Sequence, residues 1–134
     1  MQPIYELNSQ TTIDPSVFEQ IKNTTEKLLY HANNDQYTQA ITLVSSLGNE
    51  YSAIIKNALS EEMADEKSLL EQLTNANDTE ICYVICIWKD GGIDLPSMAF
   101  RKLLCTLNSK NSEALIFVMT KDGISAKIIS STMK

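Results

Sequence analysis

The chain has 134 residues, a length typical of one domain, and its 43% hydrophobic and 21% charged residues exclude a disordered chain. Its longest apolar run is far shorter than the roughly 18 residues of a membrane span, and the N-terminus has no basic segment before an apolar core. We therefore expect neither a signal peptide nor a membrane partner. Three cysteines without metal-type spacing favour a reducing compartment, so we expect a cytoplasmic protein; they are Cys82, Cys86 and Cys105.

The net charge of −6 is unevenly distributed along the chain. Seven acids and one lysine lie between residues 61 and 80, so this stretch alone carries a charge equal to that of the whole molecule. A negative field of this kind repels phosphate and excludes nucleic acid as the main ligand. It would attract a basic protein, although a solvated helix face that keeps the protein soluble is an alternative interpretation.

The first sixty residues show helical spacing of apolar side chains. Asp14 and Pro15 are typical of a helix start and predict a helix over residues 15–32. A second stripe ends at Gly48 and a third follows it, which predicts an antiparallel helical hairpin around Gly48 and Asn49. The second stripe consists of Tyr37, Ala40, Ile41, Val44 and Leu47, and the third of Tyr51, Ile54, Ile55 and Ala58.

Another apolar stripe begins after Leu59, out of phase with the previous one. Either Ser60 caps a new helix, which we favour, or one long helix carries an exposed acidic middle. The polar stretch 74–78 ends this helical half. The new stripe consists of Met63, Leu69, Leu70 and Leu73.

The second half of the chain has the pattern of a sheet. Residues 81–88 and 115–119 are apolar on both alternating faces, as expected for strands that are covered on both sides. Each run ends in Lys-Asp-Gly, and residues 124–128 alternate as the return strand of a hairpin. Residues 97–107 fit a helix better than a strand, although a strand is left open, and a helix there makes the first two strands parallel.

These patterns together predict an α+β fold. An N-terminal helical half of three or four helices, at about residues 1–75, would pack on a small mixed β-sheet. The C-terminal half, at about residues 79–134, would form that sheet in the order β-α-β-β. Both halves would belong to a single domain spanning residues 1–134.

The sequence contains little catalytic machinery. His31 is the only histidine and Arg101 the only arginine, and no phosphate-binding glycine motif occurs. A Cys-His catalytic pair would have to join His31 to one of three apparently buried cysteines, and we do not favour it. We expect no catalytic residues, no metal site and no cofactor.

A small acidic chain of this kind is typical of a protein-binding protein. The favoured hypothesis is an immunity or antitoxin-type inhibitor that covers the cleft of a basic toxin, possibly a nuclease, and is not an enzyme. A chaperone or scaffold subunit is the alternative, and an enzyme with a cysteine or carboxylate site is a weaker one; a homo-oligomer is left open. The expected partner-binding residues are Glu61, Glu62, Asp65, Glu66, Trp88 and Tyr51.

Overall fold

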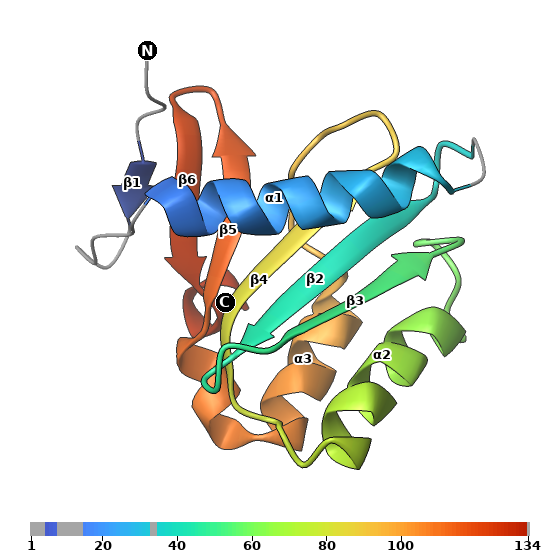
Figure 1. Ribbon diagram of the computed structural model, residues 1–134, viewed down its shortest axis with the longest axis vertical. Coiled ribbons are helices and arrows are strands. Elements are labelled where there is room, and N and C mark those ends of the chain that lie inside the picture. The colour runs from blue at the N-terminus through green and yellow to red at the C-terminus, as the bar shows by residue number, and fades with distance from the viewer. Residues whose placement is uncertain (1–4, 8–14, 33–34, 134) are drawn as a thin grey trace.

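The computed structural model describes residues 5–7, 15–32 and 35–133, and its elements form three layers (Figure 1). Helix α1 (Pro15–Tyr30) covers one face of a mixed sheet, while α2 (Ala64–Asn75) and α3 (Met98–Leu107) lie side by side on the other. The strands are β1 (Tyr5–Leu7), β2 (Gln39–Ser45), β3 (Glu50–Ile55), β4 (Ile81–Trp88), β5 (Leu115–Thr120) and β6 (Gly123–Ile128). Two 3-10 turns, η1 (Ser109–Glu113) and η2 (Ile129–Thr132), flank the last two strands.

The six strands are arranged in the order β1-β6-β5-β4-β2-β3. Strands β4 and β5 run parallel and pair only at Tyr83 with Leu115 and Val84 with Ile116. Further along they separate, and the loop before α3 lies between them: Met119 N donates to Ile93 O at 3.0 Å. The carboxyl ends of two parallel strands therefore meet the loop that leads into α3, a place where open α/β sheets commonly bind ligands.

The helical hairpin predicted for residues 37–58 is wrong, because these residues form the β-hairpin β2–β3 with its turn at Gly48. Both faces of β2 are buried, since Ala40 contributes to the core beneath α1 while Ile41 and Leu43 contribute to the core beneath α2 and α3. A strand covered on both faces loses its period-two pattern. Without that alternation, the apolar residues of β2 matched the spacing of a helix, and a helix was therefore predicted.

The predicted fold class is wrong for the same reason. The N-terminal part is not a helical half packed on a C-terminal sheet, because it supplies strands to the same sheet. Most other predicted elements are confirmed: the helices α1, α2 and α3, the parallel pair β4–β5 and the hairpin β5–β6. Helix α2 begins at Ala64 instead of being capped by Ser60, and Asp14 lies outside the described residues. In the described part of the chain, the helices are too short or too polar to cross a membrane.

The interface between α1 and the sheet combines aromatic packing with a chain of hydroxyl groups. The rings of Phe18 and Phe117 meet edge to face with centroids 5.1 Å apart. Beside them Thr25 Oγ1 lies 2.6 Å from Thr42 Oγ1, which in turn lies 3.0 Å from Ser52 Oγ. These hydroxyls satisfy one another, so the polar atoms beneath α1 cost little stability.

The opposite end of the β2–β3 hairpin is tied to the start of β4 by one carboxylate. Asp78 Oδ2 accepts hydrogen bonds from Ser45 Oγ at 2.8 Å, Asn49 Nδ2 at 2.9 Å and Tyr51 Oη at 2.8 Å. The bonds from Asn49, Ser45 and Tyr51 hold the pKa of Asp78 below its ordinary value, although burial opposes them. Asp78 therefore stabilises the fold while it is ionised.

We predict that Asp78→Asn lowers the melting temperature at neutral pH, because three donors lose a charged acceptor. Because the pKa of Asp78 is lower in the folded state than its unfolded value of 3.8, the ionised carboxylate stabilises the fold above about pH 3.8. This contribution disappears as the pH falls through the pKa of the folded state. The variant should therefore lose less stability than the wild type on acidification, as followed by circular dichroism. The exposed Asp122→Asn is the matched control; equal melting temperatures of wild type and Asp78→Asn at neutral pH would contradict the prediction.

Candidate functional site

The first turn of α2 is held against the end of β3. Met63 has a left-handed backbone (φ 55°) directly before the helix, and its carbonyl accepts from Lys67 N at 2.9 Å. Asp65 Oδ2 accepts a hydrogen bond from Lys56 N at 2.9 Å, and its Oδ1 lies 4.0 Å from Lys56 Nζ. These contacts fix the loop that precedes the helix and leave the next residue, Glu66, on the side that faces the sheet.

Glu66 is a buried carboxyl group, only 4% exposed. It lies near β4, since the pKa of the Cys86 thiol is raised by burial and then by the charges of Asp94 and Glu66. Among the described residues the Glu66 carboxylate has one hydrogen-bonding partner, its own backbone N–H. Burial, and to a smaller extent the charge of Asp65, raises the pKa of Glu66 above its ordinary value. A buried carboxyl group without a partner destabilises the fold.

Gln39 is a second buried polar side chain on this face, also 4% exposed. Side chains alternate along a strand, and Ile41 and Leu43 lie in the core beneath α2 and α3, so Gln39 shares their face. In the register of β2 with β4, Gln39 pairs with Trp88 and Ile41 with Cys86. The Gln39 amide makes no hydrogen bond within the described part of the chain.

Trp88 contributes an indole ring at the same end of the sheet. It alternates with Ile87, which lies in the core beneath α1, and therefore points to the face of Cys86. Trp88 Nε1 donates to Asp94 Oδ2 at 3.2 Å, in the loop that leads to α3. The ring is half-buried, so one part of it is accessible at the rim.

The start of α3 closes this region from the other side. Ser97 caps the helix, its Oγ accepting from Phe100 N at 3.1 Å. Phe100 is completely buried in the core that also contains Met63. The Arg101 guanidinium donates to Pro96 O at 3.0 Å and to Thr132 O at 2.8 Å, which ties the loop before α3 to η2.

The arrangement places two buried polar groups, neither with a partner from another described residue, on the face of the sheet that α2 and α3 cover. Because its pKa is raised, the Glu66 carboxyl group is able to donate a hydrogen bond when protonated as well as accept one. The Gln39 amide both donates and accepts. Buried polar groups without partners are uncommon in folded proteins, and those that occur often serve catalysis or bind a ligand. We call Gln39 and Glu66, with Trp88 at the rim, the candidate site.

The structure separates the residues that the sequence analysis grouped as one partner-binding surface. Glu61 and Glu62 are exposed before α2, and Asp65 is held by Lys56. Glu66 is buried, and Tyr51 is engaged with Asp78. Contact with a basic protein stays a prediction, and the exposed acids of the predicted surface are Glu61 and Glu62.

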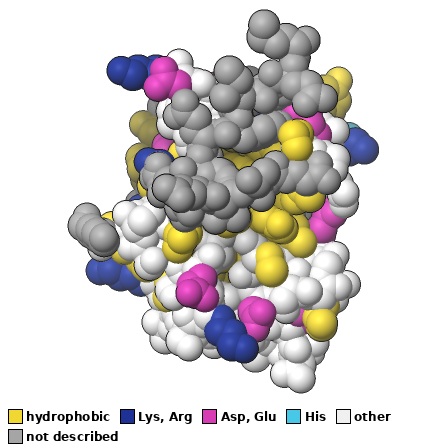
Figure 2. Space-filling view, turned by 90° about the vertical axis from the view of Figure 1, so that its left-hand side faces the viewer, with side chains coloured by type: hydrophobic (Ala, Val, Ile, Leu, Met, Phe, Trp, Pro, Cys, Tyr) yellow, Lys and Arg dark blue, Asp and Glu magenta, His cyan; other side chains and the backbone are white. Residues whose placement is uncertain are grey.

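Asp65, Glu66 and Glu71 lie in α2, which packs on β3 at one edge of the sheet, and Glu61 and Glu62 precede it. Figure 2 looks onto the other edge, beside β1 and β6, where acidic and basic side chains of the described residues are interspersed.

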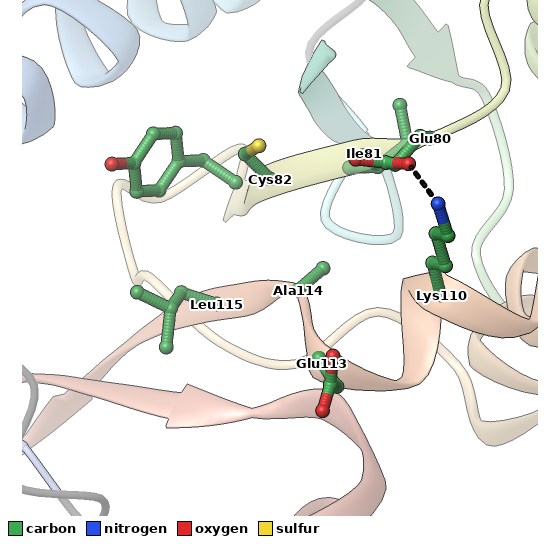
Figure 3. Close-up of a pocket in the computed structure, with 8 residues that line it drawn as sticks. Glu80, Ile81, Cys82, Lys110, Glu113, Ala114 and Leu115 are labelled. Atoms are coloured by element: carbon green, nitrogen blue, oxygen red, sulfur yellow. Dashed lines mark ion pairs between the residues drawn. The ribbon is translucent and has the colours of Figure 1, made fainter. Parts of the chain in front are cut away.

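A shallow hollow of about 370 Å³ lies at the start of β4 and β5 (Figure 3). Lys110 Nζ and Glu80 Oε1 form an ion pair of 3.3 Å at its rim, with the Lys110 side chain exposed and the Glu80 side chain half-buried. Cys82 borders the hollow, and burial followed by the charge of Glu80 raises the pKa of its thiol. The charged groups here are paired or solvated, in contrast to the candidate site.

The cysteines do not form a nucleophilic site. Burial raises the pKa of all three thiols, Cys86 most strongly, so none is an activated thiolate. His31 follows α1, on the opposite face of the sheet from Cys86. In the described residues no group of three or more histidine, cysteine or acidic side chains is placed to hold a metal ion.

Comparison with known proteins identifies the fold. No family model and no curated protein matches the sequence. Among solved structures, the cytidine deaminase from Mycobacterium leprae is 15% identical with a TM-score of 0.63, covering 87% of this chain and 96% of that chain. The cytidine deaminase from Mycobacterium tuberculosis is 12% identical with a TM-score of 0.65 (90% and 94% covered), and that from Bacillus anthracis is 11% identical with a TM-score of 0.66 (87% and 86%). The chain thus has the fold of the cytidine deaminases.

This likeness corrects the expected function. The structural neighbours are cytidine deaminases, so the prediction of an immunity or antitoxin-type inhibitor is wrong. The prediction that the chain is not an enzyme is contradicted as well, because the fold is an enzyme fold. The net charge and the lack of familiar catalytic motifs were insufficient grounds for these two predictions, because function depends on the particular site that a fold carries.

The zinc ion of such deaminases does not fit the residues of this chain. Zinc deaminases hold the metal with His or Cys side chains in the signature H-x-E…P-C-x-x-C. Here Glu66 ends the stretch Ala64-Asp65-Glu66, and Pro96 begins the stretch Pro96-Ser97-Met98-Ala99-Phe100. The glutamate and the proline are present, but the three ligand positions hold alanine, serine and phenylalanine, which are not zinc ligands.

Sequence reasoning missed Gln39 and assigned Glu66 to the surface. Glu66 sits in a run of acids, and only its phase with Leu69 and Leu73, the buried residues of α2, indicates that it faces inward. Gln39 precedes an apolar run that was assigned to a helix, so its place on a strand face was not predicted.

We predict that Glu66→Gln raises the melting temperature at neutral pH by a few degrees. With a raised carboxyl pKa, the folded and unfolded states bind the proton equally below the unfolded value of 4.5, and the unfolding free energy falls as the pH rises through the folded value. The gain should therefore vanish below about pH 4, in thermal melts over a pH series. Glu62→Gln, exposed on the preceding turn, should change little; a loss of stability in Glu66→Gln at neutral pH would show that Glu66 has a stabilising partner.

Proposed function

We propose that this protein recognises a free nucleobase or nucleoside at the candidate site, with Glu66 and Gln39 as the hydrogen-bonding groups. The cytidine deaminase fold supports the class of ligand, and the position of Glu66 in an x-x-Glu stretch in the first turn of α2 supports the place. The proposal concerns recognition at this position, and it assigns no zinc-dependent step to the chain.

The observation that carries the proposal is the burial of Glu66 without a partner from another residue among those described. Such a group lowers stability, and proteins commonly retain destabilising polar groups where function requires them. The satisfied carboxylate of Asp78, with three donors on one oxygen, is the contrasting case in the same chain. Glu66 thus has the features of a functional residue, whereas Asp78 has those of a structural one.

The chemistry of the two groups suits a base edge. Nucleobases present adjacent donors and acceptors, which glutamine and carboxyl groups bind in matching pairs. The Trp88 ring at the rim supplies the apolar surface against which flat bases commonly stack. The net charge of −6 opposes phosphate, so a base or nucleoside is favoured over a nucleotide or a nucleic acid.

The loop between β3 and α2 is hydrogen-bonded to the residues that directly precede β2. Ala58 N donates to Tyr37 O at 2.9 Å, and Thr38 Oγ1 donates to Lys56 O at 3.2 Å, so the loop is pinned beside Gln39. Leu59 at its outer side is 62% exposed, whereas Ala58 packs against the core beneath α2 and α3.

Binding is testable with the intrinsic fluorescence of Trp88, the single tryptophan of the chain. We predict that at least one of cytosine, cytidine, uridine, adenosine and guanosine changes the Trp88 emission and binds in calorimetry. Gln39→Leu and Glu66→Met should each weaken that binding about tenfold, or about 1.4 kcal/mol, the scale of one lost hydrogen bond.

Both substitutions replace an unpartnered polar group by an apolar one of similar size, so the fold should be retained. Glu62→Gln is the control for a change of charge at the same end of α2. The proposal is overturned if none of these compounds binds at about 1 mM, or if both variants bind with the affinity of the wild type.

A further inference from the structure

The N-terminal ends of α2 and α3 contain no side chain able to bind zinc in the manner of the deaminases. All histidines and cysteines of the sequence lie within the described residues, and none falls in 60–67 or 95–101. No histidine or cysteine is therefore available at these helix ends, however the signature is aligned with the sequence. The side chains that stand at the ligand positions contribute packing and capping instead.

The residues at the two cysteine positions of P-C-x-x-C, Ser97 and Phe100, have structural roles in this chain. Ser97 Oγ accepts the N–H of Phe100 at 3.1 Å and caps α3, a role that a thiol performs poorly. The Phe100 side chain is 0% exposed and belongs to the same core cluster as Met63, Leu69 and Leu104. A benzyl group thus occupies the core beside α2 where the signature would place a metal-binding sulfur.

We infer that apolar packing has replaced the metal as the link between α2 and α3, and that the chain folds and functions without zinc at this position. A zinc site joins its ligands by bonds that contribute directly to folding stability. Here the link is the contact of α2 and α3 side chains through Phe100 and its neighbours. This inference is independent of which ligand the candidate site binds.

The wild type gives the first measurement. Protein produced in zinc-supplemented medium should contain substoichiometric zinc by elemental analysis, and a strong chelator should leave its melting temperature unchanged. One tightly held zinc ion per chain, with a melting temperature that falls on chelation, would overturn the inference.

The second measurement restores the ligands in one variant. Ala64→Cys, Ser97→Cys and Phe100→Cys together place a thiol at each of the three ligand positions, the Cys₃ form of the deaminase zinc site. This variant should bind one Co²⁺ ion with the thiolate-to-metal absorption of a sulfur site, and the bound metal should raise its melting temperature.

The matched control also lacks the Phe100 ring but has one thiol fewer; it combines Ala64→Cys, Ser97→Cys and Phe100→Ala. It should bind Co²⁺ far more weakly than the triple-cysteine variant, because it offers the metal two thiols instead of three. A folded triple-cysteine variant that binds no better than the control would overturn the assignment of these positions. Circular dichroism of both variants establishes that they are folded.

Discussion

Helices cover both faces of the central strands, and this constraint decides what each side chain of the sheet is able to do. Ala40, Ile41, Leu43 and Ile85 are all within 1% of complete burial, although they point to opposite faces. A polar group on either face must therefore find a protein partner or a ligand, since water does not reach it. The candidate site is defined by Gln39, whose side chain has no hydrogen-bonding partner among the described residues, and by Glu66, whose carboxylate has only its own backbone N–H.

Three polar clusters in the molecule show how this requirement is met or left unmet. Beneath α1 the hydroxyls of Thr25, Thr42 and Ser52 satisfy one another. At the end of the hairpin, Asp78 collects three donors and is ionised more readily as a result. Gln39 and Glu66 differ from both, because they combine deep burial with free hydrogen-bonding capacity. A purely structural role favours apolar side chains at both positions, and the proposed function rests on this contrast.

The comparison of fold and residues separates scaffold from chemistry. The chain has the fold of cytidine deaminases at 11–15% identity, has a glutamate in the first turn of α2 and a proline before α3, and has no cysteine or histidine at the N-terminal ends of these two helices. Phe100 contributes core packing where a metal ligand would stand. A layered fold tolerates such an exchange, because burial of a large aromatic side chain supplies about as much stability as a core residue can.

The sequence by itself determined the local elements whose signals are strong: α1 from its Pro15 start, α3 from its apolar stripe, and the strands β4, β5 and β6 from their apolar runs and Gly-containing turns. Tertiary structure alone decided that residues 39–55 are a hairpin, because burial of β2 on both faces removes the period that distinguishes a strand from a helix. It also decided that Glu66 faces inward beside Cys86 while its acidic neighbours face solvent. The place of an acid within a charge run does not predict which side of the helix faces the sheet. In α2 the side that carries Glu66 faces the sheet, and this makes Glu66 the centre of the candidate site.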